Sequence, residues 1–515
     1  MRNSLIRRFS SGTLVMLLLV LALTTVLVGC AGGEEETART AGSSSIDTSG
    51  TTPENATTPI SHLPDGLNYG NDTVTILSFY REGWTSGELN AEGFNSDPVN
   101  NAVYERNQLV ETQLGVKLSC ILEKNDDPQV VIRMVSSSIS ANSHEYDILA
   151  SACCDMMNAS LSGIFTDLRR SQYLDLEQPW WTQGFNDAVS YKGTQYGVTG
   201  SIVLSMYRFA FVTLFNKRLF DDAKIRYPYD NVRNHTWTLD YQQSLLNTLH
   251  RDNGNGTQDE QGDVYGLVTN DYISTDPYWS SCQVSILTRD EEGGYTLDDF
   301  DAAKLSGVAD KLIHLMHGTQ ATYVYTHKES DYEQDDIRNM FAAGNAAMAT
   351  LRIMAMESEV LRSMHDEYGV VPMPTYDEAQ QQYRTLLHDL FTVLAIPHTA
   401  VQADRVDEIS AVLEAMSYQS YLLVRPAYYD VALRGKLIQD ADSAEMLDIV
   451  INNIYMDPGI LYTNALSCFH DAFRHIIESK QNTVSSTYGR SMIRTTRQKL
   501  KTLQDSLNKL VDRGN

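Results

Sequence analysis

The sequence predicts an α/β fold built on parallel β-sheets, and three observations support this. Segments with strand alternation and segments with helical periodicity follow one another between residues 73 and 150. Asp-Pro pairs at residues 97–98 and 127–128 mark helix starts within that region, because Asp caps a helix and Pro suits its first turn. The chain has 515 residues, too many for one small core. A parallel sheet with right-handed crossovers, repeated in a second lobe, fits this order.

The elements of the first lobe follow from local patterns. Residues 73–80 are rich in β-branched and apolar side chains and predict the first strand. The helix that starts at Asp97-Pro98 places its valines on one face and ends at Gly115. Alternating apolar residues at 116–122 predict a second strand, a helix follows Asp127-Pro128, and residues 146–150 form the third strand.

The later chain keeps this alternation. We expect strands at residues 209–215, 346–351, 368–371 and 392–396, and helices near residue 216 and at 336–343. From about residue 483 the chain is polar with spaced leucines, which predicts a long surface helix packed along one stripe.

The N-terminus has the layout of a secretory signal. Three arginines precede an apolar run at residues 14–28, which ends in Gly29-Cys30. This junction resembles the lipobox of bacterial lipoproteins, which implies removal of residues 1–29 and lipid attachment to Cys30. The alternative is an ordinary secretion signal with a chance cysteine. Residues 30–60 are rich in Gly, Ser, Thr and Glu and predict a disordered tether.

Charge and cysteine content narrow the class of protein. The formal net charge is −26, which argues against nucleic acid or anionic lipid as a partner. The five cysteines after Cys30 are odd in number and irregularly spaced, which argues against a disulfide framework. Walker A, G-x-S-x-G and H-E-x-x-H motifs are absent from the sequence.

Several segments, taken in order, resemble family 1 of the extracellular solute-binding proteins of ABC transporters, which serve mostly sugars. They are the strand-to-helix element at 215–220, the Pro-Tyr and Thr-Trp-Thr stretches at 228–229 and 236–238, the helix-to-strand turn at 340–348, and the segments 426–430 and 445–448. The resemblance implies a two-lobed periplasmic-binding-protein-like type II fold with a ligand cleft between the lobes. It places residues 61–203 and 366–424 in one lobe, and residues 204–365 and 425–515 in the other.

Candidate ligand contacts come from residue type and position. Sugar rings offer an apolar face to aromatic side chains, and their hydroxyls pair with charged or amide groups. On this basis we expect six residues on cleft-side loops or at the lobe crossing: Trp84, Asp155, Arg208, Tyr278, Trp279 and Arg352. The competing interpretation for each is structural: a packed aromatic ring or an ion pair.

Residues 251–260 resemble the calcium loop of some members of that family. Oxygen ligands would come from Asn253, Asn255, the Thr257 carbonyl, Asp259 and Glu260, and Gly256 would allow the sharp turn. Arg251 departs from the pattern, because it stands where the first acidic ligand belongs. The alternative is a Gly/Asn turn that keeps the loop shape without metal.

Two functions from different classes fit this sequence. The first is a lipid-anchored, extracytoplasmic binding protein that needs no cofactor and no catalysis, captures a carbohydrate by hinge closure and delivers it to ABC permease subunits. The second is a surface lipoprotein hydrolase, since a carboxylate pair could be present among the many acids. A ligand sensor for a signalling partner is a third reading.

Overall fold

The computed structural model describes residues 61–259, 262–326, 334–429 and 440–514. All of them belong to one compact unit. The predictions for the signal peptide, Cys30 and the tether therefore fall outside the described residues, as does Glu260. Among the described residues no helix combines the length and hydropathy needed to cross a bilayer.

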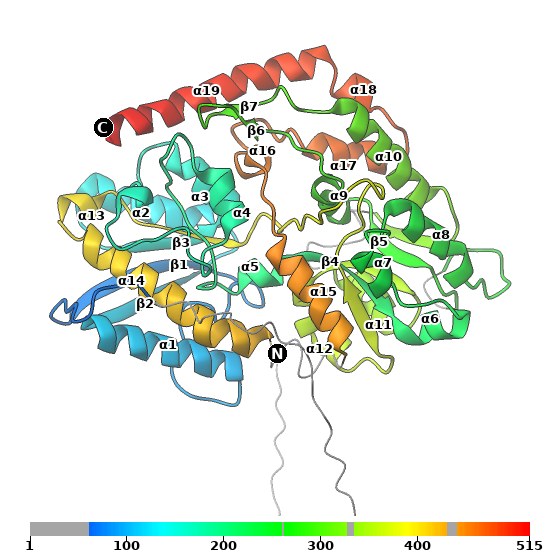
Figure 1. Ribbon diagram of the computed structural model, residues 1–515, viewed down its shortest axis with the longest axis horizontal. Helices are drawn as coiled ribbons and strands as arrows, with labels where there is room; N and C mark the ends of the chain where they lie inside the picture. Colours follow the sequence, from blue (N-terminus) through cyan, green and yellow to red (C-terminus); the bar gives the residue numbers. More distant parts are fainter. Residues whose placement is uncertain (1–60, 260–261, 327–333, 430–439, 515) are drawn as a thin grey trace, which may run out of the picture. The chain divides into compact units, whose positions relative to one another are not determined.

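The first sheet has the order β11-β3-β1-β2 (Figure 1). It consists of β1 (Asp72–Tyr80), β2 (Val116–Lys124), β3 (Ile148–Ala152) and β11 (Thr392–Ala395). β1 is parallel to β2 and β3, whereas β11 runs antiparallel to β3. Every residue of β3 and β11 is buried, as expected for a sheet with both faces covered.

Helices of the first lobe begin where the sequence predicts. α1 (Pro98–Leu114) starts after Asp97, whose Oδ1 accepts the Val99 N–H at 2.9 Å, and ends at Gly115 with φ 60°. The remaining helices here are α2 (Gln129–Ala141), α3 (Cys153–Ser160), η1 (Leu168–Arg170), α4 (Gln183–Val189), α13 (Thr399–Gln402) and α14 (Val406–Gln419), which continues into the π-helical turn η4 (Ser420–Val424). Both α14 and η4 pack on α1.

The second sheet has the order β10-β4-β9-β5-β8. Its strands are β4 (Phe211–Asn216), β5 (Leu267–Asn270), β8 (Thr322–Tyr325), β9 (Met348–Arg352) and β10 (Tyr368–Val371). A small hairpin, β6 (Thr288–Arg289) with β7 (Tyr295–Thr296), lies outside it. The helices of the second lobe are α6 (Lys217–Ala223), α7 (Tyr229–Arg233), α8 (Leu239–Leu249), η2 (Ile273–Thr275), α9 (Asp276–Ser281), α10 (Ala302–His317), α11 (Asp335–Ala342), η3 (Ile353–Glu357), α12 (Glu359–Arg362) and α15 (Ala441–Asn452).

Two chain crossings between the sheets run side by side. The first includes α5 (Ser205–Arg208) and the second lies between β10 and β11. Ala210 and Leu387 form an antiparallel bridge, and the His388 N–H donates to the Phe209 carbonyl at 3.0 Å. A third crossing follows η4, since α14 packs on α1 and α15 packs on β10.

The structure shifts some predicted boundaries. Residues 366–424 were assigned to the first lobe, but β10 pairs with β4 in the second sheet, so the chain returns to the first sheet only after residue 371. The strand expected at 209–215 starts at Phe211, because Phe209 caps α5. The helix expected from residue 483 is broken at Tyr488-Gly489 into α18 (Val484–Thr487) and α19 (Arg490–Gly514).

The C-terminal segment touches elements of both lobes. α16 (Pro458–Leu461) packs on α3 and α4, whereas α17 (Asp471–Glu478) and α18 pack on α10. On α19, Asn508 accepts the Tyr191 hydroxyl at 3.2 Å, and Gln504 donates to the Tyr295 carbonyl at 2.7 Å. The assignment of residues 425–515 to the second lobe alone is therefore too simple.

Candidate functional site

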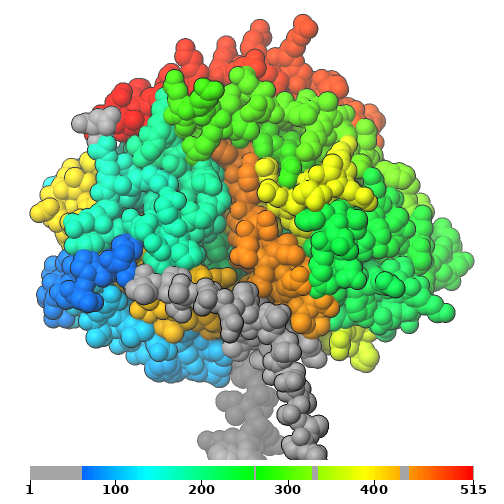
Figure 2. Space-filling view, viewed as in Figure 1, coloured from blue at the N-terminus to red at the C-terminus, as the bar shows by residue number. Residues whose placement is uncertain are grey.

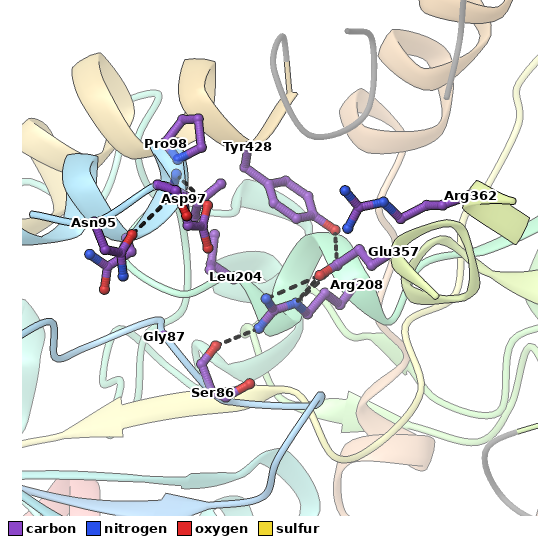
Figure 3. A pocket seen from close by; sticks show the side chains of 13 residues that line it. Ser86, Gly87, Asn95, Asp97, Pro98, Leu204, Arg208, Glu357, Arg362 and Tyr428 are labelled. Atoms are coloured by element: carbon purple, nitrogen blue, oxygen red, sulfur yellow. Dashed lines mark hydrogen bonds and ion pairs between the residues drawn. The ribbon is translucent and has the colours of Figure 1, made fainter. Parts of the chain in front are cut away.

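A cavity of about 760 Å³ lies beside the first and third crossings. We call it the crossing cavity (Figure 3). Residues from the loop after β1, the start of α1, α5, η3, α12 and the segment after η4 line it: Ser86, Gly87, Asn95, Ser96, Asp97, Pro98, Val99, Asn100, Leu204, Arg208, Glu357, Arg362 and Tyr428. Ligand pockets commonly measure 300–1,000 Å³, so the cavity has the volume for a small oligosaccharide.

Arg208 joins the two sides of the crossing cavity. Its Nε donates to Glu357 Oε1 at 3.0 Å, and its Nη1 donates to the Ser86 carbonyl at 2.8 Å. The Tyr428 hydroxyl donates to the same Glu357 oxygen at 2.6 Å. Burial lowers the pKa of Arg208, but Glu357 raises it and the net shift is upward, so the guanidinium stays charged. Arg208 therefore forms the ion pair of the structural interpretation and also lines the cavity, and its contact with a ligand stays a prediction.

The loop after β1, which lines the first-lobe side of the cavity, is held in place by two buried charged residues. Glu88 accepts the backbone N–H groups of Leu204 and Ser205 at 3.1 and 3.0 Å, and it also accepts the Thr392 hydroxyl. Burial raises the pKa of this carboxyl, and the hydrogen bonds oppose that shift. Arg106 donates to the Glu88, Leu89 and Ile202 carbonyls at 3.0 to 3.2 Å. These contacts fix the loop against the first crossing.

Two of the predicted contacts, Trp84 and Arg352, lie together but are packed. Trp84 is 2 % exposed and meets Phe209 and His388 edge to face, with ring centroids 5.2 and 5.7 Å apart. The Arg352 guanidinium carbon lies 5.2 Å from the Trp84 ring. We call these four residues the Trp84 cluster. None of them lines the crossing cavity.

Tyr278 and Trp279 are buried in the second lobe rather than displayed on a loop. Both lie on α9, and Trp279 stacks on Phe300 with centroids 6.3 Å apart. Trp279 also lines a hollow of about 20 Å³, which has room for little more than one water. The two aromatic side chains expected to contact a sugar are therefore part of a core.

Asp155 lies in the first turn of α3 and accepts a hydrogen bond from the Gln129 amide. Burial raises the pKa of this carboxyl. It is not among the residues that line the crossing cavity. Of the six predicted contacts, only Arg208 reaches that cavity. Sequence reasoning missed Glu357 and Tyr428, whose only signals were their places just after a strand and within a segment of family resemblance.

The predicted calcium loop holds itself together through its own side chains. The Asn253 and Asn255 side-chain amides donate to Asp259 Oδ2 at 3.4 and 2.7 Å, and Asn255 Oδ1 accepts the Thr257 N–H at 2.8 Å. No cluster of three or more His, Cys, Asp or Glu side chains that suits a metal occurs among the described residues. These hydrogen bonds use the side-chain oxygens of Asn253 and Asn255 and one oxygen of Asp259, whereas the buried Asp259 Oδ1 has no hydrogen-bond partner in the described part of the chain. Bound calcium stays a prediction.

Comparison with known proteins finds a likeness of structure to solved proteins. No family model and no curated protein matches the chain. An ABC substrate-binding protein of Listeria monocytogenes in complex with cycloalternan matches at 16% identity and a TM-score of 0.52, covering 84% of this chain and 99% of that one. A sugar transporter protein of Rhizobium etli in an open conformation matches at 14% identity and a TM-score of 0.54, covering 83% and 99%.

A solute-binding protein of Thermotoga lettingae bound with α-D-tagatose matches at 15% identity and a TM-score of 0.52, covering 84% of this chain and all of that one (100%). At such identities the likeness concerns the fold. With its two α/β sheets, paired crossings and interposed cavity, the chain has the two-lobed fold of the periplasmic solute-binding proteins.

Proposed function

We propose that this chain is the lipid-anchored, substrate-binding component of an ABC importer, and that it captures a sugar or oligosaccharide in the crossing cavity. One observation carries the proposal: a cavity of about 760 Å³ whose walls come from both lobes and from two crossings. The structural neighbours named above, which include proteins in complex with cycloalternan and tagatose, support the choice of ligand class.

The cavity lining suits a ligand that carries many hydroxyl groups. Ser86, Asn95 and Asn100 supply neutral donors and acceptors, whereas Arg208 and Glu357 supply charged ones. Because the walls belong to different lobes, a ligand that contacts both stabilises the closed arrangement over an open one. The permease would then recognise the closed, loaded form.

The carboxylates of the cavity favour binding over hydrolysis. Glu357 is held by Arg208 and Tyr428, and Asp97 caps α1. A glycosidase needs one carboxyl free to donate a proton and a second free to act as base or nucleophile. Both cavity carboxylates are already engaged in structural contacts, so we place the hydrolase second.

A thermal-shift and calorimetry screen tests the proposal. Cycloalternan, maltotetraose and tagatose are added to the purified protein, and the reaction mixtures are then analysed for products. We expect at least one sugar to raise the melting temperature without turnover; a ligand at a hundredfold its Kd stabilises by ~2.7 kcal/mol. No response to any sugar would reject the carbohydrate ligand, and product formation would support the hydrolase.

Substitution of two exposed arginines, one inside the cavity lining and one outside it, tests where the sugar binds. Arg362 lines the crossing cavity, whereas Arg226 lies on the surface of the second lobe. We expect Arg362→Gln to weaken sugar binding by roughly threefold to tenfold, since it removes one charge-assisted hydrogen bond. Arg226→Gln, the matched control, should leave Kd unchanged. Equal effects of the two substitutions would place the ligand elsewhere.

Membrane attachment is tested separately, in cells. An alkyne analogue of palmitate should label the wild-type protein, and Cys30→Ser should abolish the label. Labelling that persists in the variant would move the anchor away from Cys30. Operon context separates importer from sensor: adjacent permease genes favour transport, and an adjacent histidine kinase favours sensing.

A further inference from the structure

The last helix differs in charge from the rest of the protein. The whole chain has 66 acidic and 40 basic residues. α19 instead contains seven basic residues and two acidic ones, Asp505 and Asp512. Its leucines at 500, 503, 507 and 510 are buried against the body of the protein. Its apolar face is therefore already packed, whereas several of its basic residues are exposed.

Four of the basic residues form a single row, which we call the basic stripe: Arg490, Arg494, Arg497 and Lys501. Their spacing of four, three and four residues confines them to an arc of about 60° around the helix. All four side chains are exposed, and the helix lies at the surface of the molecule, where the C-terminal segment is coloured red in Figure 2.

The stripe is largely uncompensated. Arg497 pairs with Asp298 at 2.9 Å, and both side chains are more than half exposed. Arg490, Arg494 and Lys501 form no ion pair with any described residue. Asp505 lies one turn beyond Lys501 and is the nearest acid along the helix. Arg490, Arg494 and Lys501 therefore present three exposed cations that form no short ion pair with a described residue.

The chemistry of the stripe distinguishes between kinds of partner. The exposed large apolar side chains among the described residues are Phe94, Leu109, Ile121, Val360 and Val401, and none lies on α19. A protein interface needs apolar anchors at its centre, and an inserting amphipathic helix needs a free apolar face. A row of cations without either fits an array of separate anions, such as phosphate groups at a bilayer surface.

We propose that the basic stripe of α19 is a docking surface for the anionic phospholipid headgroups of the membrane. Each Lys or Arg near such a surface is attracted by its negative potential, and the attraction acts only within about one Debye length, ~8 Å. Within α19 itself, seven basic residues face only two acidic ones, so the local balance of charge is positive. The net-charge argument against anionic lipid therefore holds for the whole chain and fails for this helix.

A lipid anchor at Cys30 would make weak docking effective. If residues 30–60 form the flexible tether that their composition predicts, its root-mean-square length is roughly 30 Å, which would keep the folded unit within reach of the bilayer. The stripe would then set which face of the folded unit meets the membrane. The proposal depends on the charge pattern of α19 and not on the identity of the sugar.

Vesicle co-sedimentation of residues 59–515, the compact unit that holds every described element, tests the proposal without the lipid. We expect binding to vesicles of phosphatidylcholine with about 30 mol % phosphatidylglycerol, and at least roughly tenfold weaker binding to pure phosphatidylcholine. Salt near 1 M should abolish the binding, because the Debye length falls to ~3 Å. Equal binding to both vesicle types would overturn the proposal.

Two variants with the same change in net charge locate the surface. The stripe variant carries Arg490→Gln, Arg494→Gln, Arg497→Gln and Lys501→Gln. The control carries Lys117→Gln, Lys124→Gln, Lys224→Gln and Arg226→Gln, four exposed positions on other elements. Both should keep the wild-type melting temperature, since exposed substitutions change stability little. We expect only the stripe variant to lose binding, and equal loss in both would overturn the proposal.

Discussion

The crossing cavity and the Trp84 cluster both lie near the crossings between the two sheets, but they differ in residue type and in packing. The cavity is open and is lined by Ser, Asn, Asp, Glu and Arg side chains together with Gly87, Pro98, Val99 and Leu204, and Tyr428 is its one aromatic residue. The cluster is closed, and its aromatic rings and guanidinium group contact one another at 5 to 6 Å. Aromatic residues near the crossings therefore pack against one another, whereas the lining of the cavity leaves room for a ligand.

This contrast predicts that the cluster stabilises the fold and that the cavity binds the ligand, and mutation can test both roles. Substitutions in the cluster should change the free energy of unfolding, and substitutions in the cavity should change ligand affinity.

The largest effect is expected for Trp84→Ala. It removes a side chain that is 2 % exposed and leaves a cavity in its place. Large-to-small substitutions of this kind lower the free energy of unfolding by about 3–5 kcal/mol. Phe94→Ala, in the same loop, is the control, because Phe94 is 70% exposed and should change stability by no more than ~0.5 kcal/mol. Denaturant unfolding measures both. A mild Trp84→Ala phenotype with a large loss of sugar affinity would instead place Trp84 in the binding site.

The second prediction extends the contrast to carboxyl groups. Glu414, fully buried, accepts the Trp180 and Trp181 indole N–H groups at 3.0 and 3.1 Å, and burial raises its pKa to about 8. The folded-state pKa exceeds the unfolded value of 4.5, so its contribution to stability is present below pH 4.5 and is lost as pH rises to about 8. The loss should be on the order of several kcal/mol.

Unfolding free energies measured across that pH range check this expectation. Glu414→Gln should flatten the profile, because the amide does not titrate. Glu177→Gln should leave the profile unchanged, since the Glu177 side chain is 71% exposed. An unaltered slope in Glu414→Gln would show that another group is responsible.

Much of the scaffold could be predicted from sequence, because local chemistry determines it. Asp97 caps α1 and Gly115 ends it, as the spacing indicated. The return to the first sheet could not be predicted in the same way. β10 is short and apolar like a strand of either sheet, and its pairing with β4 depends on long-range contacts.

The candidate site was harder to predict for a physical reason. Trp84, Trp279 and Arg352 are residue types that serve equally well as sugar contacts and as core filling, and the sequence does not distinguish these roles. Glu357 and Tyr428 become visible only when the fold brings them to Arg208. Residue type indicates what a side chain can contact, but the burial of its neighbours decides whether a ligand can reach it.

A third prediction concerns the cavity itself. Tyr428→Phe keeps the ring and removes the 2.6 Å hydrogen bond to Glu357. Hydrogen bonds to charged groups contribute ~1.5–3 kcal/mol, so we expect sugar affinity to fall about tenfold if Glu357 must be held in place for binding. Calorimetric titration measures this change. Tyr191→Phe is the control, since its 3.2 Å hydrogen bond to Asn508 lies outside the cavity lining. An unchanged Kd in Tyr428→Phe would exclude Glu357 from the binding site.

The smallest effect is expected at the loop of residues 253–259, which belongs to neither region. Calcium there must displace the amide groups that hold Asp259, and Arg251 supplies no negative charge. We therefore expect a weak site with a Kd in the millimolar range. Calcium at about tenfold such a Kd would stabilise the protein by ~1.4 kcal/mol, and Asp259→Asn should remove the effect. Asp65→Asn, at an exposed position outside the loop, is the control. A large fall in melting temperature on adding EGTA alone would mean that the loop holds calcium tightly, and that Glu260 or a rearranged Asp252 replaces the missing first ligand. Sugar affinity should not respond to calcium in either case, because none of the loop's residues lines the crossing cavity.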